Sequence, residues 1–283
     1  MNTDALKYAV RATVPRPLRN WLRSPSHSAE WLWDAVRFSL GSVESFEIVP
    51  NLRLAFHPHA YKLFLQSQVD DPEQRDEFRS FISHCRRGML LFDIGAHYGV
   101  FSLVAAQLGG AAVAVDPSPA AAKMISVQAS LNHLLDRIRI LQSAVSDSDC
   151  TLAMLDVGVL SAGYFKLTKE GRPSQELTSA HATTVDLLVR QFGPPTHIKI
   201  DVEGHEAAVL RGARTALQTF APILFVELHT EMVRSDGGDP CAALDELHRL
   251  GYSTHAFSGE PIATDAILNR PIVRIVARPA HRP

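Results

Sequence analysis

Two glycines four residues apart, Gly95 and Gly99, lie in the segment Asp93-Ile94-Gly95-Ala96-His97-Tyr98-Gly99, which follows an apolar run. Glycine lets a backbone turn sharply and approach a ligand closely. A helix that begins directly after such a turn presents free N–H groups and a partial positive charge to an anion. Asp116 ends a second apolar run, 21 residues after Gly95, where a carboxylate can accept both hydroxyl groups of a ribose. The spacing therefore predicts a site for a nucleoside that carries a small anionic group.

The residues inside this loop favour one kind of nucleoside. A dinucleotide-binding loop has the pattern Gly-x-Gly-x-x-Gly, but His97 stands at the second glycine, where its side chain would crowd a diphosphate. The Gly-x-x-x-x-Gly-Lys-Ser/Thr pattern of a triphosphate site is absent from the sequence. S-adenosylmethionine fits better, because its amino group would meet Asp93, its carboxyl group the loop amides, and its ribose Asp116. An NAD-dependent oxidoreductase is the alternative that this loop leaves open.

A second group of acids and histidines follows two later apolar runs. Asp201 lies at the carboxyl end of the run His197–Ile200, where a buried acid requires a partner. Glu203 follows on the same side of an extended chain, His205 comes two residues later, and His229 follows the next apolar run. Side chains of these types can orient a reactant or take a proton from it. We therefore predict Asp201 and Glu203 as active-site acids, and His205 and His229 as candidate bases.

The charged residues around this group receive other roles. Lys199, inside an apolar strand, is expected to pair with an acid or to extend its ammonium group to solvent at a sheet edge, rather than to act as a nucleophile. Glu206, in the first turn of a predicted helix, is expected to favour the helix dipole rather than to take part in catalysis. Asp201, Glu203 and Glu227 could offer oxygen ligands to a divalent metal. Their spacing is not diagnostic, so no metal is predicted and the question stays open.

Apolar runs that alternate with helical segments place these residues at strand ends. Strands are predicted at Met89–Ile94, Ala111–Val115, Ile138–Leu141, His197–Ile200, Ile223–Leu228, Tyr252–Phe257 and Ile272–Val276. Helices are predicted at Val100–Leu108, Ser118–Asn132, Thr184–Gln191, Glu206–Thr219 and from Asp239 to Gly251, with an irregular stretch through Gly158 and Gly171. This alternation indicates an α/β fold with a doubly wound parallel sheet, in which ligands bind at the carboxyl ends of the strands.

Residues 1–87 differ in character and are interpreted as an N-terminal extension of a cofactor-binding domain at 88–283. In this extension we predict a helix at Glu30–Leu40, a strand pair at Phe46–Val49 and Leu52–Phe56, and a helix from Asp71 to about Cys85. The segments expected to select the acceptor are Met1–Cys85, Ala153–Ser179 and Arg234–Pro240.

The composition limits the class of partner. The 283 residues carry 28 Lys and Arg against 30 Asp and Glu, a formal net charge of −2, so general affinity for nucleic acid is not expected. Three distant cysteines predict neither a disulfide framework nor a Cys-rich zinc site. The sequence contains no apolar run of about 20 residues and no signal peptide, so a cytoplasmic protein is expected. Five basic residues against one Asp in residues 1–24 could give weak contact with an anionic membrane surface.

Several segments together resemble the FkbM-type methyltransferase family. They are Leu91–Gly99, Val115–Pro119, Ile198–Glu206, Leu210-x-Gly212 and Val226–His229. The resemblance spans Leu90 to Thr230, about half the chain, and Ile-Lys-Ile-Asp-Val-Glu-Gly-His-Glu is its most distinctive part. It implies a seven-stranded class I methyltransferase (Rossmann-like) fold and S-adenosylmethionine-dependent O-methylation, commonly of a hydroxyl of a sugar, glycolipid or other natural product. The family often has Glu at Asp116 and Asn at His97, and ribose binding is expected to survive the first change.

These observations define the predicted site. The cofactor-binding residues are Asp93, Gly95, Ala96, Gly99, Asp116, Pro117, Ser143, Ala144 and Asp201. The acceptor is expected to be a small molecule or a glycan, and the oligomeric state is left open. A fold that holds the cofactor without turnover is a third hypothesis, which the polar cluster Asp201, Glu203 and His205 disfavours because such a module has no need of acids in its cleft.

Overall fold

The computed structural model of the chain describes residues 44–156, 165–167 and 177–280. The chain divides into two compact units, residues 1–63 and 64–283. In the first, β1 (Glu44–Val49) and β2 (Leu52–Phe56) pair antiparallel, which confirms the predicted strand pair. They turn at Pro50 and Asn51, and Asn51 has a φ of 69°. The predicted helix Glu30–Leu40 and the basic N-terminal arm lie outside the described residues.

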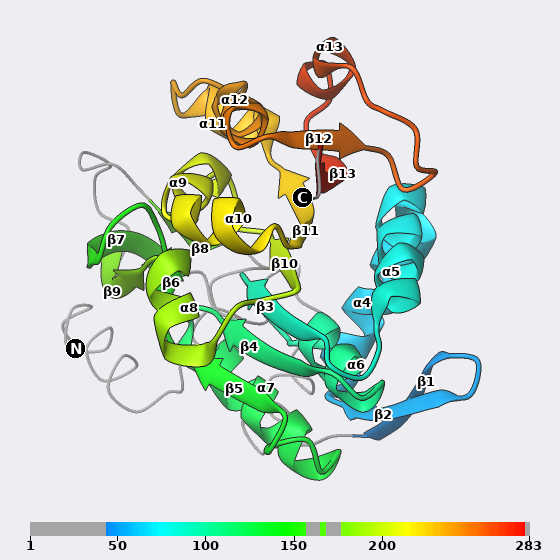
Figure 1. The fold of residues 1–283 in the computed structure, drawn as a ribbon. Helices are drawn as coiled ribbons and strands as arrows, with labels where there is room; N and C mark the ends of the chain where they lie inside the picture. The colour runs from blue at the N-terminus through cyan, green and yellow to red at the C-terminus, as the bar shows by residue number, and fades with distance from the viewer. Residues whose placement is uncertain (1–43, 157–164, 168–176, 281–283) are drawn as a thin grey trace, which may run out of the picture. The chain divides into compact units, whose positions relative to one another are not determined.

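The second unit is built on one seven-stranded sheet (Figure 1). Its order is β12 (Tyr252–His255), β13 (Val273–Pro279), β11 (Ile223–Leu228), β10 (His197–Ile200), β3 (Leu90–Ile94), β4 (Ala111–Val115) and β5 (Ile138–Leu141). The five strands from β11 to β5 are parallel, and β13 runs antiparallel to both of its neighbours. The predicted class I methyltransferase fold, with its mainly parallel doubly wound sheet, is confirmed.

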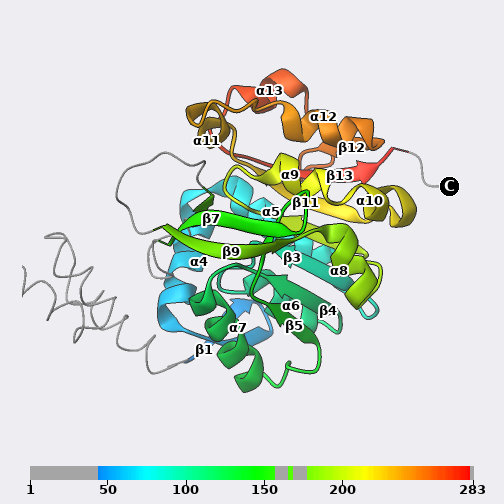
Figure 2. The same ribbon diagram turned by 90° about the vertical axis from the view of Figure 1, so that its left-hand side faces the viewer.

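Helices cover both faces of this sheet (Figures 1 and 2). One face carries α5 (Pro72–His84), α6 (Val100–Gln107) and α7 (Pro119–Leu131); the other carries α8 (Val185–Phe192), α9 (Glu206–Arg211), α10 (Arg214–Phe220) and α12 (Ala242–Arg249). Helices α5 and α7 begin at the predicted caps, because the side chains of Asp71 and Ser118 accept backbone N–H groups of the first turns. Helix α4 (Pro58–Asp70) precedes α5.

The two faces have different cores. Beneath α5 and α6 the core is aromatic, with the Phe81 ring centred 4.8 Å from Phe101 and 5.7 Å from Phe225. Beneath α8, α9, α10 and α12 it is aliphatic, with Ile198 and Ile200 fully buried. Side chains of a strand alternate between faces, so Lys199, which lies between these two isoleucines, projects into the aromatic face. The proposed boundary at residue 87/88 stays a prediction, although α5 packs against β13.

Two helix predictions need correction. The helix expected at Glu206–Thr219 is interrupted, and α9 ends before α10 begins at Arg214. A Cβ atom on Gly212 would lie 2.1 Å from the carbonyl oxygen of Ser146, so this glycine is required where the helix end meets another backbone. The helix expected from Asp239 begins only at Ala242. The short helices α11 (Thr230–Ser235) and α13 (Thr264–Leu268) were not anticipated.

The segment expected to be irregular contains a second sheet. Its order is β6 (Ala144–Val145), β9 (Leu177–Thr183), β7 (Cys150–Asp156) and β8 (Phe165–Leu167), and β7 and β9 lie edge to edge in Figure 2. Small and polar residues dominate β9, and the apolar stretches of the other three strands are short, so the sequence lacks a clear signal of a buried strand here. Gly158, Gly171 and their surroundings lie outside the described residues. Among the described residues, no helix has the length and apolar character that crossing a bilayer requires.

Candidate active site

The strand register brings the predicted residues to one edge of the sheet. Asp93 on β3 lies opposite Lys199 on β10, and the backbone N–H of Asp201 donates to the carbonyl of Ile94 at 3.0 Å. A Cβ atom on Gly95 would lie 1.8 Å from the carbonyl oxygen of Asp201. Gly95 therefore permits the first glycine turn and the end of β10 to pack against each other.

The glycine turn is closed by hydrogen bonds within the protein. The N–H groups of Gly95 and Ala96 both donate to the carbonyl of Val115, at 2.9 and 3.1 Å. Gly95 and Gly99 have φ values of 80° and 73°, in the left-handed region that favours glycine. Asp93 is buried, and its Oδ2 atom accepts from the N–H and the hydroxyl of Ser102 at 3.1 and 2.6 Å. Burial nonetheless raises the pKa of Asp93 above its usual range.

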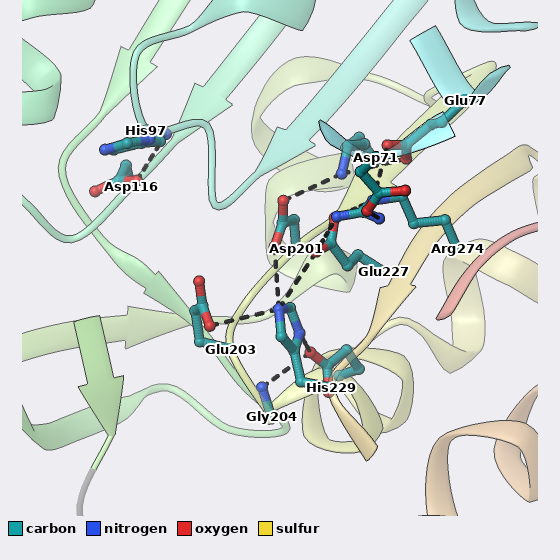
Figure 3. A network of polar contacts seen from close by, with 12 residues as sticks. Asp71, Glu77, His97, Asp116, Asp201, Glu203, Gly204, Glu227, His229 and Arg274 are labelled. Atoms are coloured by element: carbon teal, nitrogen blue, oxygen red, sulfur yellow. Dashed lines mark hydrogen bonds and ion pairs between the residues drawn. The ribbon is translucent and has the colours of Figure 1, made fainter. Parts of the chain in front are cut away.

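Asp116 is a buried carboxylate held by backbone amides. Its Oδ2 atom accepts from the N–H of His97 at 2.8 Å (Figure 3). Its Oδ1 atom accepts from the N–H of Ser118 at 2.9 Å. Burial raises the pKa of Asp116 to about 6 against the effect of these two bonds, which lower it. Each carboxylate oxygen has a further lone pair, so two ribose hydroxyls can still be accepted. Pro117 follows and is half-buried.

Two other predicted cofactor residues, Ser143 and Ala144, follow β5 and are buried. The N–H of Ser143 donates to the carbonyl of Asp116 at 3.2 Å, which brings this segment to the same sheet edge. The Ser143 hydroxyl lies 2.9 Å from the carbonyl of His181 and 2.8 Å from that of Ala144. These contacts hold the segment between the main sheet and β9.

Lys199 carries a buried positive charge beside Asp201. Its Nζ atom lies 3.3 Å from both Asp201 Oδ2 and Glu77 Oε1 and 5.0 Å from the centre of the Phe101 ring. The prediction that Lys199 pairs with an acid is confirmed. Burial alone would lower the pKa of Lys199, but the charges of Asp201 and Glu77 raise it above its usual range. Burial acts to raise the pKa of Asp201, yet Lys199 and His229 bring it below its usual value.

A second ion pair lies next to the first. Glu227 on β11 stands directly opposite Arg274 on β13, and its two oxygens accept from Arg274 Nε and Nη2, both at 2.9 Å. Arg274 also contacts Asp71 and lies 3.7 Å from Glu77 (Figure 3). Burial, and then Asp201, raise the pKa of Glu227 to about 7 although Lys199 and Arg274 oppose this.

His229 connects these acids. It is 4% exposed at the end of β11, with Nδ1 2.8 Å from Glu206 Oε1 and Nε2 3.4 Å from Glu203 Oε2. The same Nε2 atom lies 3.6 Å from Glu227 and 3.9 Å from Asp201. Burial alone would lower the pKa of His229, but the Glu206 hydrogen bond and the neighbouring carboxylates raise it to about 9. The ring is therefore an imidazolium at neutral pH.

Glu203 completes the cluster. Its φ of 53° is in the left-handed region, as is the φ of 93° at Gly204, so the chain turns abruptly between β10 and α9. Burial, with Asp201 and Glu206 close by, raises the pKa of Glu203 to about 7 despite the opposing effect of His229. A carboxylate with this pKa changes its protonation state near neutral pH.

His205 lies apart from the cluster that contains its sequence neighbours. Its Nε2 atom lies 2.9 Å from the hydroxyl of Ser146, at the end of β6. Burial lowers the pKa of His205. Of the four predicted catalytic residues, the structure therefore groups Asp201, Glu203 and His229, and turns His205 toward the second sheet.

Three further residues belong to this group of buried charges: Glu77, Glu206 and Arg274. Glu77 and Arg274 were not predicted from the sequence, and Glu206 was expected only to favour the helix dipole. Each is nearly fully buried. Glu77 precedes Phe78 on the buried side of α5, and Arg274 interrupts the apolar run of β13. A charged residue inside an otherwise apolar pattern requires a buried partner, and this signal could have identified Arg274. Glu77 gives no such signal, because it ends the polar stretch Glu73–Glu77.

A metal ion has one candidate position among the described residues. Ligand atoms of Asp201, Glu227 and His229 lie within 4.8 Å of one another. Lys199 already pairs with Asp201, and Arg274 binds both oxygens of Glu227. The positive charge that a divalent cation would supply is thus partly provided by side chains.

The donor set of this edge fits S-adenosylmethionine. Asp93 lies near the end of β3, and Asp116 and Asp201 directly follow β4 and β10. The carboxylates of all three can accept hydrogen bonds. Ribose hydroxyls and a cationic amino-acid end are the groups that such acceptors bind. Burial raises the pKa values of Asp93 and Asp116, and a bound cation favours the ionised form of both.

Comparisons with known proteins agree with this chemistry. The methyltransferase FkbM domain matches residues 93–254. The chain is similar to the hexuronic acid methyltransferase AglP of Haloferax volcanii, with 24% identity over 221 residues that cover 75% of this chain and 80% of AglP.

Solved structures give weaker matches. The methyltransferase FkbM of Methylobacillus flagellatus has a TM-score of 0.44 and 15% identity over 68% of this chain and 43% of its own, so this chain spans less than half of that protein. A TehB-like S-adenosylmethionine-dependent methyltransferase of Corynebacterium glutamicum has a TM-score of 0.39 and 13% identity, over 72% of this chain and 87% of its own.

The family match includes the residues around which the site is built. It begins at Asp93 and contains Asp116, Asp201, Glu203 and His229. It covers more than half of the 283 residues, and these relatives give no support to an NAD-dependent oxidoreductase. The chain belongs to the FkbM family of S-adenosylmethionine-dependent methyltransferases.

Proposed function

We propose that this methyltransferase acts on a hydroxyl group of a sugar-containing acceptor. The observation that carries the proposal is the Glu203–His229 pair, in which a carboxyl with a pKa of about 7 lies 3.4 Å from an imidazolium beside Asp201. A hydroxyl acceptor benefits from a base of this kind. The similarity to a protein named as a hexuronic acid methyltransferase supports a sugar acceptor.

The residues proposed to hold the cofactor surround the glycine turn. Asp116 is placed to accept the ribose hydroxyls, with Pro117, Ser143 and Ala144 beside it, and the turn itself holds the amino-acid end near Asp93 and Asp201. Bound S-adenosylmethionine supplies a methyl group that its sulfonium activates for displacement by oxygen. The protein contributes by fixing the two reactants in line, which supplies a large part of such a rate enhancement.

Glu203 is the residue that we assign to the acceptor proton. A general base works best when its pKa is near the working pH, and the pKa of Glu203 is about 7. His229 holds its proton at neutral pH because its pKa is about 9, so it stabilises the ionised form of Glu203 rather than taking the proton itself. Asp201, which Lys199 keeps ionised, orients the reactants.

Mass spectrometry tests this assignment. The purified chain is incubated with S-adenosylmethionine and a panel of neutral sugars, uronic acids and glycolipids. We expect a gain of one methyl group on a hydroxyl of a sugar-containing member. Methyl transfer only to amines, or only to carboxyl groups, would contradict the proposed acceptor class. Saturable cofactor binding with no transfer to any member would support the non-catalytic module instead.

A further inference from the structure

Glu206 is a buried acid with two functional neighbours. It is 2% exposed in the first turn of α9. Its Oε1 atom accepts the N–H of Gly204 at 2.9 Å and lies 2.8 Å from Nδ1 of His229. A carboxylate that only favoured the helix dipole would need neither contact and could stay in solvent. One oxygen of Glu206 therefore joins the turn after β10 to the side chain at the end of β11.

The turn that Glu206 stabilises is strained. Glu203 has a φ of 53° and is followed by Gly204 with a φ of 93°. A non-glycine residue in the left-handed region costs about 1–2 kcal/mol, and such conformations persist where surrounding contacts enforce them. The bond from the Gly204 N–H to Glu206 is one such contact. Glu206 thus helps to fix the backbone from which the Glu203 carboxylate extends.

The contact with Nδ1 also fixes the orientation of the His229 ring. Once Nδ1 faces Glu206, Nε2 must face the opposite side, where Glu203 is 3.4 Å away. The other charged groups that face His229 are Asp201 at the end of β10 and Glu227 on β11. Lys199 from β10, Glu77 from α5 and Arg274 from β13 surround these two acids in turn.

We propose that Glu206 is a positioning residue for methyl transfer. Its carboxylate binds Nδ1 of His229 and the N–H of Gly204, so that Nε2 of His229 and the Glu203 carboxylate face each other beside Asp201. The inference rests on the proposed function, because the base that Glu206 would position is Glu203. Glu206 itself does not contact the reactants. It sets the proton position and the charge of the ring against which Glu203 works.

The test uses Glu206→Gln, with Glu231→Gln as a matched control. Glu206 and His229 line a cavity of about 40 Å³. Gln is used because its side chain has nearly the size of Glu, whereas Ala would enlarge this cavity. Glu231 is on α11, two residues from His229, and its side chain is 64% exposed. The His229 ring is followed by NMR in protein with ¹⁵N-labelled histidine. Its resonances are identified as those that are missing from the spectrum of His229→Gln.

In the wild type we expect His229 to titrate near pH 9, and its neutral form to keep the proton on Nδ1. In Glu206→Gln the midpoint should fall by about one pH unit or more, because a neighbouring negative charge is lost, and the proton should redistribute toward Nε2. Glu231→Gln should change neither. A folded Glu206→Gln protein with an unchanged midpoint and tautomer would overturn the proposal.

A second variant and a second measurement cover the other outcomes. If Glu206→Gln does not fold, Glu206→Asp retains the charge but withdraws it by one methylene, and the His229 midpoint should fall by a smaller amount; no change would again overturn the proposal. Calorimetry of S-adenosylmethionine binding on the same samples should give affinities within about twofold of wild type, since Glu206 is not a cofactor ligand. If the wild type transfers no methyl group to any acceptor, the proposed function is rejected, and the NMR result can still be interpreted.

Discussion

Asp116 and Asp201 follow strands on either side of β3, at the same edge of the sheet, but they are held differently. Asp116 accepts two backbone N–H groups and has no cationic partner among the residues that the structure describes, and burial raises its pKa to about 6. Asp201 lies 3.3 Å from the Lys199 ammonium and near the His229 imidazolium, which lower its pKa. The proposed cofactor side of the site, at Asp116, thus depends on backbone geometry, and the proposed reactive side, at Asp201, depends on side-chain charges.

This difference determines what a substitution can change. On the reactive side each charge neutralises another, so removal of one leaves a buried ion without its partner. On the cofactor side a carboxylate can be removed with little effect on other charges, and the loss falls mainly on the ligand. The following predictions separate the two sides, in order of decreasing effect.

Glu203→Gln should have the largest effect on catalysis. The amide cannot take the acceptor proton, so kcat should fall by about 100- to 10,000-fold, the usual contribution of a general base. The KM for S-adenosylmethionine should stay close to that of wild type. The measurement is steady-state methyl transfer, with the exposed Glu231→Gln as control. A decrease of less than threefold would remove Glu203 from the role of base.

Arg274→Met should have the largest effect on stability. It leaves Glu227 and Glu77 buried without their guanidinium partner, and we expect a loss of about 3–5 kcal/mol in the free energy of unfolding. Urea denaturation measures it, with Arg278→Met on the exposed side of the same strand as control. A loss below 1 kcal/mol at neutral pH, about the value of a surface pair, would show that the network does not depend on Arg274.

The pH dependence of this loss has a definite sign. Burial raises the pKa of Glu227 from its ordinary value of 4.5 to about 7. Between these two values the folded protein binds more protons than the unfolded chain, so stability falls as the pH rises. Without Arg274 the pKa of Glu227 rises further. The deficit of Arg274→Met should therefore grow from pH 5 to pH 8, and a deficit that shrinks over this range would contradict the charge assignment.

Asp116→Ala should affect the ligand more than the fold. We expect S-adenosylmethionine affinity to fall at least about tenfold, or about 1.4 kcal/mol, because the ribose hydroxyls lose their acceptor. Isothermal calorimetry measures this, and Asp136→Ala on the exposed surface serves as control. Unchanged affinity would place the ribose elsewhere.

Chelation should have the smallest effect. Because Lys199 and Arg274 already neutralise Asp201 and Glu227, we expect methyl transfer to be the same with and without excess EDTA. Loss of activity that returns on addition of a divalent cation would assign a metal to Asp201, Glu227 and His229.

Local patterns were sufficient to predict the sheet and the glycine turn. The runs at β3, β4 and β11 are apolar almost throughout, as in strands buried on both faces, and Asp71 and Ser118 are strong caps. Strand β9 was missed because it lacks this apolar signal, and β7 because its apolar run, Leu152–Leu155, is short. The interruption near Gly212 depends on the Ser146 carbonyl, which is 66 residues away in the sequence.

The site was predicted less completely, for a similar reason. Lys199 could be assigned an acidic partner because a buried ammonium requires one, but Glu77 on a separate helix could not be identified as that partner. Glu206 and His229 are joined through a hydrogen bond that no local pattern predicts. His205 and Glu206 are adjacent in the sequence, yet their side chains contact Ser146 and His229 respectively. Side-chain direction in a tight turn depends on the tertiary structure.

The pH dependence of kcat for methyl transfer tests the central claim most directly, namely that Glu203 works as an ionised carboxylate beside a protonated His229. We predict that kcat rises with pH through a single ionisation near 7, the pKa of Glu203, and that this ionisation is absent from the residual activity of Glu203→Gln. A wild-type kcat that stays constant over about two pH units around neutrality, or the same ionisation in Glu203→Gln, would contradict the account.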